Sequence, residues 1–133
     1  MIDAAVGLSW VYASQATSAT EALLERIEAG EAFAIPPLWF TEIANSLLVL
    51  QRRGKITAPP RKNSLQRLSL LDMQVDPSDP SIAFYHISDL AETYGLTVYD
   101  ATYLELATRR GLPLATRDDA LAKAARRAGV PLL

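Results

Sequence analysis

The chain has 133 residues, half of them hydrophobic and 21% charged, and this composition is typical of a globular protein that can bury a core. The absence of cysteine excludes disulfides, thiolate metal sites and cysteine nucleophiles, and it suits a reducing cytoplasm. No apolar run approaches the roughly 20 residues of a membrane span, and the N-terminus lacks the pattern of a secretory signal. We therefore expect a cytoplasmic protein.

Short apolar segments alternate with helical patterns along the chain. Strands are predicted just before Asp3 and at residues 32–36, 73–75, 96–98, 112–116 and 130–133. Helices are predicted just after Asp3 and at residues 17–31, 37–54, 58–71, 81–95, 100–111 and 118–129, and most of them end in glycine. This alternation indicates an α/β fold with a mostly parallel sheet covered by helices on both faces. No internal repeat or linker interrupts it, so we expect one domain over residues 1–133.

The net charge of −2 conceals four blocks of opposite sign. Residues 1–50 carry one base and six acids, and residues 51–71 carry six bases and no acid. Residues 72–105 carry seven acids and no base, and residues 106–133 carry six bases and two acids. Such separation can build a basic surface beside an acidic pocket, although a basic block is often only a solvated helix face.

Several catalytic classes find no support in the residues. His86 is the only histidine, it lies inside a predicted helix, and it is better explained by packing or surface exposure than by catalysis. Without cysteine, or a serine placed beside a histidine, triads for acyl transfer are unsupported. No glycine-rich phosphate loop is present, which disfavours nucleotide hydrolysis of the P-loop type. The carboxylates remain as candidates.

Three aspartates follow apolar runs that are predicted to be strands: Asp3, Asp100 and Asp118. Because ligands of open α/β sheets bind at the carboxyl ends of the strands, these side chains should converge on one edge of the sheet. Asp100 and Asp118 also suit the simpler role of a helix N-cap. Glu42 lies in the long helix with Asn45 on the same face, which also fits the wet side of an amphipathic helix.

Taken together, the four acids favour a metal site. Carboxylates brought to one edge repel one another and raise one another's pKa, so such a cluster is best explained if a cation neutralises it. Ligands that are all oxygen select hard ions such as Mg²⁺ or Mn²⁺ over zinc. An acidic pocket beside a basic surface then suggests a polyanion whose phosphate is cut at the metal while basic side chains hold its backbone.

The sequence resembles the PIN-domain ribonucleases, and most closely the VapC-type toxins of bacterial toxin–antitoxin pairs. Four segments in the same order carry the resemblance: "IDAAVGLSW", "PLWFTEIANSL", "LTVYDATYLELA" and "LPLATRDDALAKAARRAGV". The resemblance implies a three-layer α/β/α fold with a central, mostly parallel sheet, and a Mg²⁺- or Mn²⁺-dependent endoribonuclease that acts on RNA. It also implies a homodimer and inhibition by a VapB-type antitoxin.

The family's acidic residues fall on Asp3, Glu42, Asp100 and Asp118, which the resemblance assigns to catalysis and metal binding. Asn45 and Thr116 match positions that support the site in the family. Asp119 is a neighbour that spacing makes a poorer fourth ligand than Asp118. Glu105, five residues after Asp100, could contact the site through water, but we expect it to occupy an ordinary surface position.

The sequence also departs from the family pattern. Ala5 stands where the family commonly has serine or threonine, and only two residues precede Asp3 in a strand expected to be longer. Two alternatives therefore stay open beside the toxin hypothesis. One is an RNA-processing PIN nuclease without an antitoxin, and the other is a catalytically silent PIN-like module that binds RNA or a protein.

Overall fold

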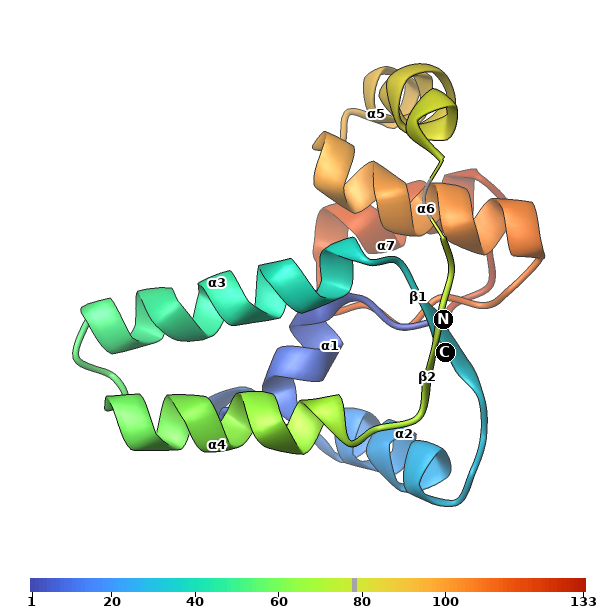
Figure 1. The fold of residues 1–133 in the computed structure, drawn as a ribbon. Coiled ribbons are helices and arrows are strands. Elements are labelled where there is room, and N and C mark those ends of the chain that lie inside the picture. Colours follow the sequence, from blue (N-terminus) through green and yellow to red (C-terminus); the bar gives the residue numbers. More distant parts are fainter. Residues whose placement is uncertain (78) are drawn as a thin grey trace.

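The computed structural model describes residues 1–77 and 79–133. In chain order the elements are α1 (Ala4–Ser9), the 3₁₀ turn η1 (Ala13–Gln15), α2 (Ser18–Glu28), β1 (Phe33–Ile35), α3 (Leu38–Arg52), α4 (Ala58–Ser69), β2 (Met73–Val75), the π-helical segment η2 (Ile82–Ile87), α5 (Ser88–Tyr94), α6 (Val98–Arg110) and α7 (Asp119–Arg127). The helices α3 and α4 form a two-helix arm beside the strands, and α5, α6 and α7 lie together on another side (Figure 1).

The strands are short, and every strand pairing in the described residues is parallel. The strand β1 pairs with β2, with Phe33 opposite Met73. Isolated parallel bridges join Ile2 to Ala115 and Leu114 to Leu132, so the segment at 114–115 lies between the two ends of the chain. Both chain ends accordingly lie close together beside β1 and β2 (Figure 1). The predicted α/β architecture with a parallel sheet is confirmed.

The strand predicted at residues 96–98 is wrong. Leu96 and Thr97 lie in a loop, and Val98 is already the first residue of α6. The reason is local, because the Thr97 hydroxyl caps the helix by accepting the backbone N–H of Asp100 at 3.1 Å. The helix therefore begins two residues earlier than predicted and uses the apolar Val98 in its first turn. The strands expected near both chain ends shrink to the single bridges described above.

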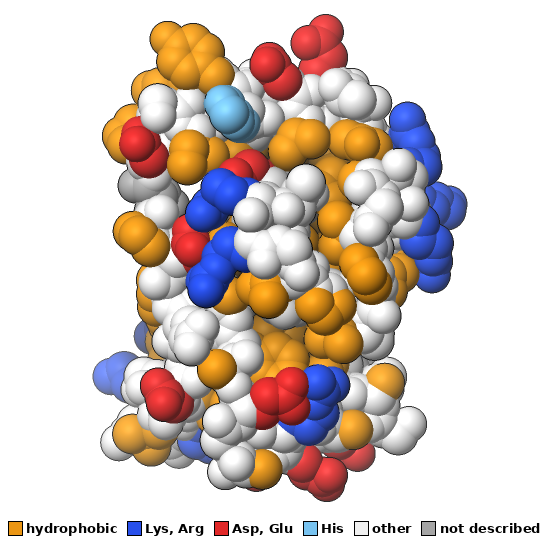
Figure 2. All heavy atoms as spheres, turned by 90° about the vertical axis from the view of Figure 1, so that its right-hand side faces the viewer, with side chains coloured by type: hydrophobic (Ala, Val, Ile, Leu, Met, Phe, Trp, Pro, Cys, Tyr) orange, Lys and Arg blue, Asp and Glu red, His pale blue; other side chains and the backbone are white. Residues whose placement is uncertain are grey.

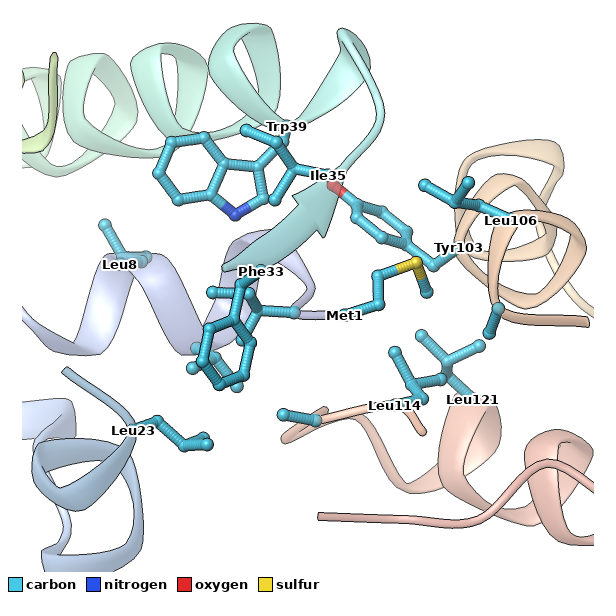
Figure 3. Close-up of a cluster of buried hydrophobic side chains, with 14 of the residues drawn as sticks. Met1, Leu8, Leu23, Phe33, Ile35, Trp39, Tyr103, Leu106, Leu114 and Leu121 are labelled. Carbon is cyan, nitrogen blue, oxygen red and sulfur yellow. The ribbon is translucent and has the colours of Figure 1, made fainter. Parts of the chain in front are cut away.

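The core joins the sheet to the helices around it, and Figure 3 shows part of this cluster of buried side chains. Trp39 is 1% exposed, and its indole N–H donates to the Asp3 carbonyl at 3.1 Å. Gly7 lets α1 approach α3 closely, since a Cβ added there would lie 2.5 Å from the Trp39 ring and 2.7 Å from Ile43. A larger residue at position 7 would push α1 away from α3, and these two helices carry candidate site residues at their starts.

No helix within residues 1–77 and 79–133 is both long enough and apolar enough to span a membrane.

Candidate active site

Four carboxylates line one open cavity of about 300 Å³: Asp3, Glu42, Asp100 and Asp118. Each comes from a different part of the chain, namely the N-terminal bridge, the first half of α3, the first turn of α6 and the residue before α7. Their sequence separations are long, so the tertiary fold alone brings them together. The roles assigned to them from the sequence stay predictions, but their shared location is a property of the structure.

Asp3 is the most deeply buried of the four, at 3% exposure. It follows the bridge between Ile2 and Ala115 and caps α1, with its Oδ1 accepting the Val6 N–H at 2.8 Å. The Thr116 hydroxyl donates to its other oxygen, Oδ2. Burial raises the pKa of the Asp3 carboxyl, and the hydrogen bonds from Thr116 and Val6 oppose that rise. Both oxygens are held by donors, so this carboxylate is fixed in direction.

Glu42 is half-buried and receives a hydrogen bond from the Tyr103 hydroxyl on its Oε2. In Figure 3 this hydroxyl points from α6 toward the start of α3. Burial is the main cause of a raised pKa at Glu42, the charges of Asp100 and Asp3 add to it, and the bond from Tyr103 opposes it. Burial also raises the pKa of Tyr103, which therefore stays a neutral donor. Sequence reasoning missed this tyrosine, although it lies three residues after Asp100.

Asp100 is not the N-cap of α6, which corrects one role considered from the sequence. It is the third residue of the helix, and Thr97 provides the cap. The Thr97 hydroxyl donates to Asp100 Oδ2 at 2.6 Å, and the Asp100 backbone N–H bonds back to the same hydroxyl. Thr97 and Asp100 thus form two mutual hydrogen bonds at the start of α6, and the Asp100 carboxylate also lines the cavity.

Asp118 does cap α7, and its Oδ1 accepts the Leu121 N–H at 2.8 Å. Its own backbone N–H donates to the Thr116 hydroxyl at 3.0 Å. Thr116 therefore connects the backbone before α7 to the carboxylate of Asp3. Asp119 is exposed as the first residue of α7, and it is not among the residues that line the cavity.

The remaining predicted residues differ in position. Asn45 is exposed on α3 and does not line the cavity, whereas its neighbour Ser46 does. Ala5 and Gln15 also line it, so the position where a serine or threonine was expected contributes a methyl group. The sequence placed Ser46 on the polar stripe of this helix with Glu42 and Asn45, one helical turn after Glu42, but Ser46 was not predicted as a site residue.

A second group of acids is neutralised by arginines. Glu105 is buried and pairs with Arg109 at 2.7 Å, and Arg109 also contacts Asp76 at 2.6 Å. Arg110 reaches Asp76 at 3.3 Å. The expectation that Glu105 occupies an ordinary surface position is wrong. Figure 2, which views the side opposite the α3–α4 arm, shows basic and acidic side chains adjoining near the centre of the face.

The four cavity acids have no such partner. Among residues 1–77 and 79–133, every lysine or arginine ion pair goes to another acid, and the cavity acids accept only hydroxyl and backbone N–H groups. No three of the described acidic or histidine side chains converge closely enough to chelate an ion as they stand. The donors themselves fit a hard divalent cation, since all are carboxylate oxygens facing one water-accessible cavity.

Comparison with known proteins decides the family. The profile of the PIN domain family matches residues 1–127. This chain belongs to the PIN domain family. PIN domains are generally nucleases that use divalent metals, and the fold is associated with RNA binding.

A solved structure supports the same fold. The crystal structure of PAE2754 from Pyrobaculum aerophilum is similar to this PIN domain with a TM-score of 0.73 and 24% sequence identity, over 92% of this chain and 82% of that chain. A search of curated proteins gave no match. The solved structure thus supports the α/β/α PIN fold, and the chemistry has to be argued from the cavity.

Proposed function

We propose that this PIN domain is a Mg²⁺- or Mn²⁺-dependent endoribonuclease. The observation that carries the proposal is the convergence of Asp3, Glu42, Asp100 and Asp118 on one cavity without a basic partner among the described residues. Four carboxylates arranged this way repel one another, and burial raises the pKa of two of them. A divalent cation would relieve both effects.

The same four carboxylates would hold the cation. When bound, Mg²⁺ or Mn²⁺ would contact phosphate oxygens, lower the pKa of a water molecule and stabilise charge on the leaving oxygen. The expected products of RNA hydrolysis carry 5′-phosphate and 3′-hydroxyl ends.

Neighbouring side chains and backbone groups hold the carboxylates in fixed directions before a cation binds. Thr116 and the Val6 N–H fix the direction of Asp3, and Thr97 fixes one oxygen of Asp100. Tyr103 holds Oε2 of Glu42, which leaves Oε1 to contact the cation or the water that the cation would activate. The side chains that hold the carboxylates are therefore hydroxyls, from Tyr103 on α6 and from Thr97 and Thr116 in the loops before α6 and α7.

We also propose that the protein is the toxin of a VapBC-type pair, acts as a homodimer and is inhibited by a VapB-type antitoxin. This finer assignment rests on the four sequence segments that resemble VapC toxins. Induced expression of the chain should arrest growth of a bacterial host, and co-expression of an antitoxin encoded beside it should restore growth. Growth arrest that persists in the Asp100→Asn variant would contradict a toxic activity at this site.

The endoribonuclease is tested by incubating total cellular RNA with purified protein in Mg²⁺, in Mn²⁺ and in chelator. Cleavage is expected with either metal, none in chelator, and none from the Asp100→Asn variant, whose fold is checked by circular dichroism. The variant also excludes a contaminating nuclease. Equal cleavage by the Asp100→Asn protein would overturn the proposed site.

A further inference from the structure

The tip of the α3–α4 arm carries a dense positive charge with no acid near it in sequence. Residues 43–71 contain six bases and no acid, and five of those bases lie at or near the turn between the helices: Arg52, Arg53, Lys55, Arg61 and Lys62. All but the half-buried Arg61 are exposed. None of the five forms an ion pair with any residue in the described part of the chain. We call these five residues the arm tip.

Helix stability explains only part of this charge. Arg52 lies in the last turn of α3, where the helix dipole favours a cation. Arg61 and Lys62 lie near the start of α4, where the dipole favours anions, and the first turn of α4 has no acid to compensate. The bases of α7 contrast with this arrangement, because Arg126 and Arg127 lie in its last turn and acids occupy its start.

Two features of the arm tip fix the position of Arg61. The Arg61 Nε donates to the Gln51 side chain at 2.6 Å, which ties the start of α4 to the end of α3. Two prolines, Pro59 and Pro60, follow the first residue of α4 and restrict the backbone before Arg61. Positive groups held in place at a helix start, with no carboxylate beside them, are suited to an external anion.

The acid cavity and one residue of the arm tip, Arg53, lie along one face of α3. Glu42 and Ser46 line the cavity, and the helical period continues this stripe through Val49 to Arg53. Eleven residues separate Glu42 from Arg53, which corresponds to about 16 Å along the helix at 1.5 Å per residue. Figure 1 shows the arm leading away from the strands to the turn at its tip. A single RNA strand several nucleotides long could span both places.

We propose that the arm tip is a second RNA-binding site, which holds the phosphate backbone of the strand whose scissile phosphodiester lies in the acid cavity. This inference rests on the proposed endoribonuclease function and gives the direction in which the substrate runs, along α3. The arm tip contacts phosphates and reads no bases, so it contributes affinity that depends on salt and little sequence specificity.

The test measures binding of a fluorescent, single-stranded 12-nucleotide RNA by anisotropy at several salt concentrations. The full chain carries Asp100→Asn in every case, and Mg²⁺ is present, so that binding is measured without cleavage. One variant adds Arg53→Gln and Lys55→Gln at the arm tip. A matched control adds Lys123→Gln and Arg126→Gln on α7, which removes the same charge from exposed positions elsewhere.

The arm-tip variant is expected to bind RNA about tenfold more weakly at low salt, with the slope of log affinity against log salt reduced by about 1.4, or 0.7 for each lost contact. The α7 control is expected to retain the affinity and slope of its parent. Equal loss in both variants, no loss in the arm-tip variant, or no RNA binding at all would overturn the proposal.

A cleavage assay on the same substitutions with Asp100 restored separates this inference from the proposed function. If RNA is cut and the arm-tip variant has an unchanged KM, the proposed nuclease activity is supported and the proposed RNA-binding role of the arm tip is refuted. If no RNA is cut while the arm-tip variant still loses binding selectively, the arm tip is an RNA-binding site, and the proposed nuclease is refuted together with the link between this site and a scissile phosphodiester.

Discussion

Two groups of acids each include a residue of α6, Asp100 in one and Glu105 in the other, and the groups differ in their partners. Glu105 and Asp76 are each paired with an arginine at 2.6–2.7 Å, so their charges are neutralised within the fold. Asp3 and Glu42 line the acid cavity, where their carboxylates accept hydrogen bonds only from hydroxyl and backbone N–H groups. Burial raises the pKa of both. The first group carries its own basic partners, whereas the second has none among the described residues. Buried acids thus indicate a function here only where no base accompanies them.

The largest expected effect is a difference in cleavage rate between substitutions of two adjacent aspartates, Asp118 and Asp119. Asp118→Asn should lower the cleavage rate by at least about 100-fold, because it removes a carboxylate from the cavity while an asparagine can still cap α7. Asp119→Asn removes the same charge one residue away, outside the cavity lining, and should leave the rate nearly unchanged. The measurement is the initial rate on an RNA that the wild-type protein cuts. Similar losses in both variants would mean that the cavity does not define the site.

Removing a base from the neutralised group should harm stability. Arg109→Ala leaves Glu105 buried without its partner and should lower the free energy of unfolding by about 1–3 kcal/mol. This range is lower than that of a fully buried ion pair, because Arg109 is partly exposed and solvent screens its charge. Urea unfolding at neutral pH measures the change. The Arg109→Ala, Glu105→Gln double variant should recover part of the loss, because the buried charge is also gone. A single variant as stable as the wild type would show that the pairs contribute nothing.

Removing an acid from the cavity should have the opposite effect. Asp3→Asn, measured in chelator at pH 7, should raise the free energy of unfolding by on the order of 1 kcal/mol, since asparagine keeps the cap and loses the buried charge.

The effect of Asp3→Asn should depend on pH. A carboxyl whose pKa is raised in the folded state favours folding while it is protonated, and that contribution is lost as pH rises from the ordinary value of 3.8 through the raised one. The advantage of Asp3→Asn should therefore vanish in acid and grow toward neutral pH. A variant less stable than the wild type at every pH would contradict the account.

A divalent cation should shift the thermal stability of the wild-type protein by a smaller amount. Millimolar Mg²⁺ or Mn²⁺ should raise Tm by a few degrees, because an ion that binds only the folded chain stabilises it. The same addition should leave Asp100→Asn nearly unchanged, and Arg109→Ala should respond like the wild type. Differential scanning fluorimetry gives the comparison, and an equal response in all three proteins would indicate unspecific ion binding.

The sequence predicted the fold class and most helices, because helix periodicity and terminal glycines are local signals. It predicted that Asp100 would lie close to Asp3 and Asp118, and these residues line one cavity. The predicted reason was wrong, since no strand ends just before Asp100 and Thr97 caps the helix instead. The hydrogen bond from Tyr103 to Glu42 and the ion pair between Arg109 and Asp76 could not be predicted, because each joins α6 to a residue outside it. The pair between Glu105 and Arg109 spans one turn of α6, so helix spacing could have indicated it. Helix spacing alone could likewise have indicated that Ser46 faces the cavity.

The most direct test of the central claim is calorimetric titration of Mn²⁺ into the protein. The account predicts saturable binding by the wild type and by Asp119→Asn, and binding at least about tenfold weaker in Asp100→Asn and in Glu42→Gln. Absence of Mn²⁺ binding by the wild type, or equal binding by all four proteins, would contradict the claim that the unpaired carboxylates form a metal site.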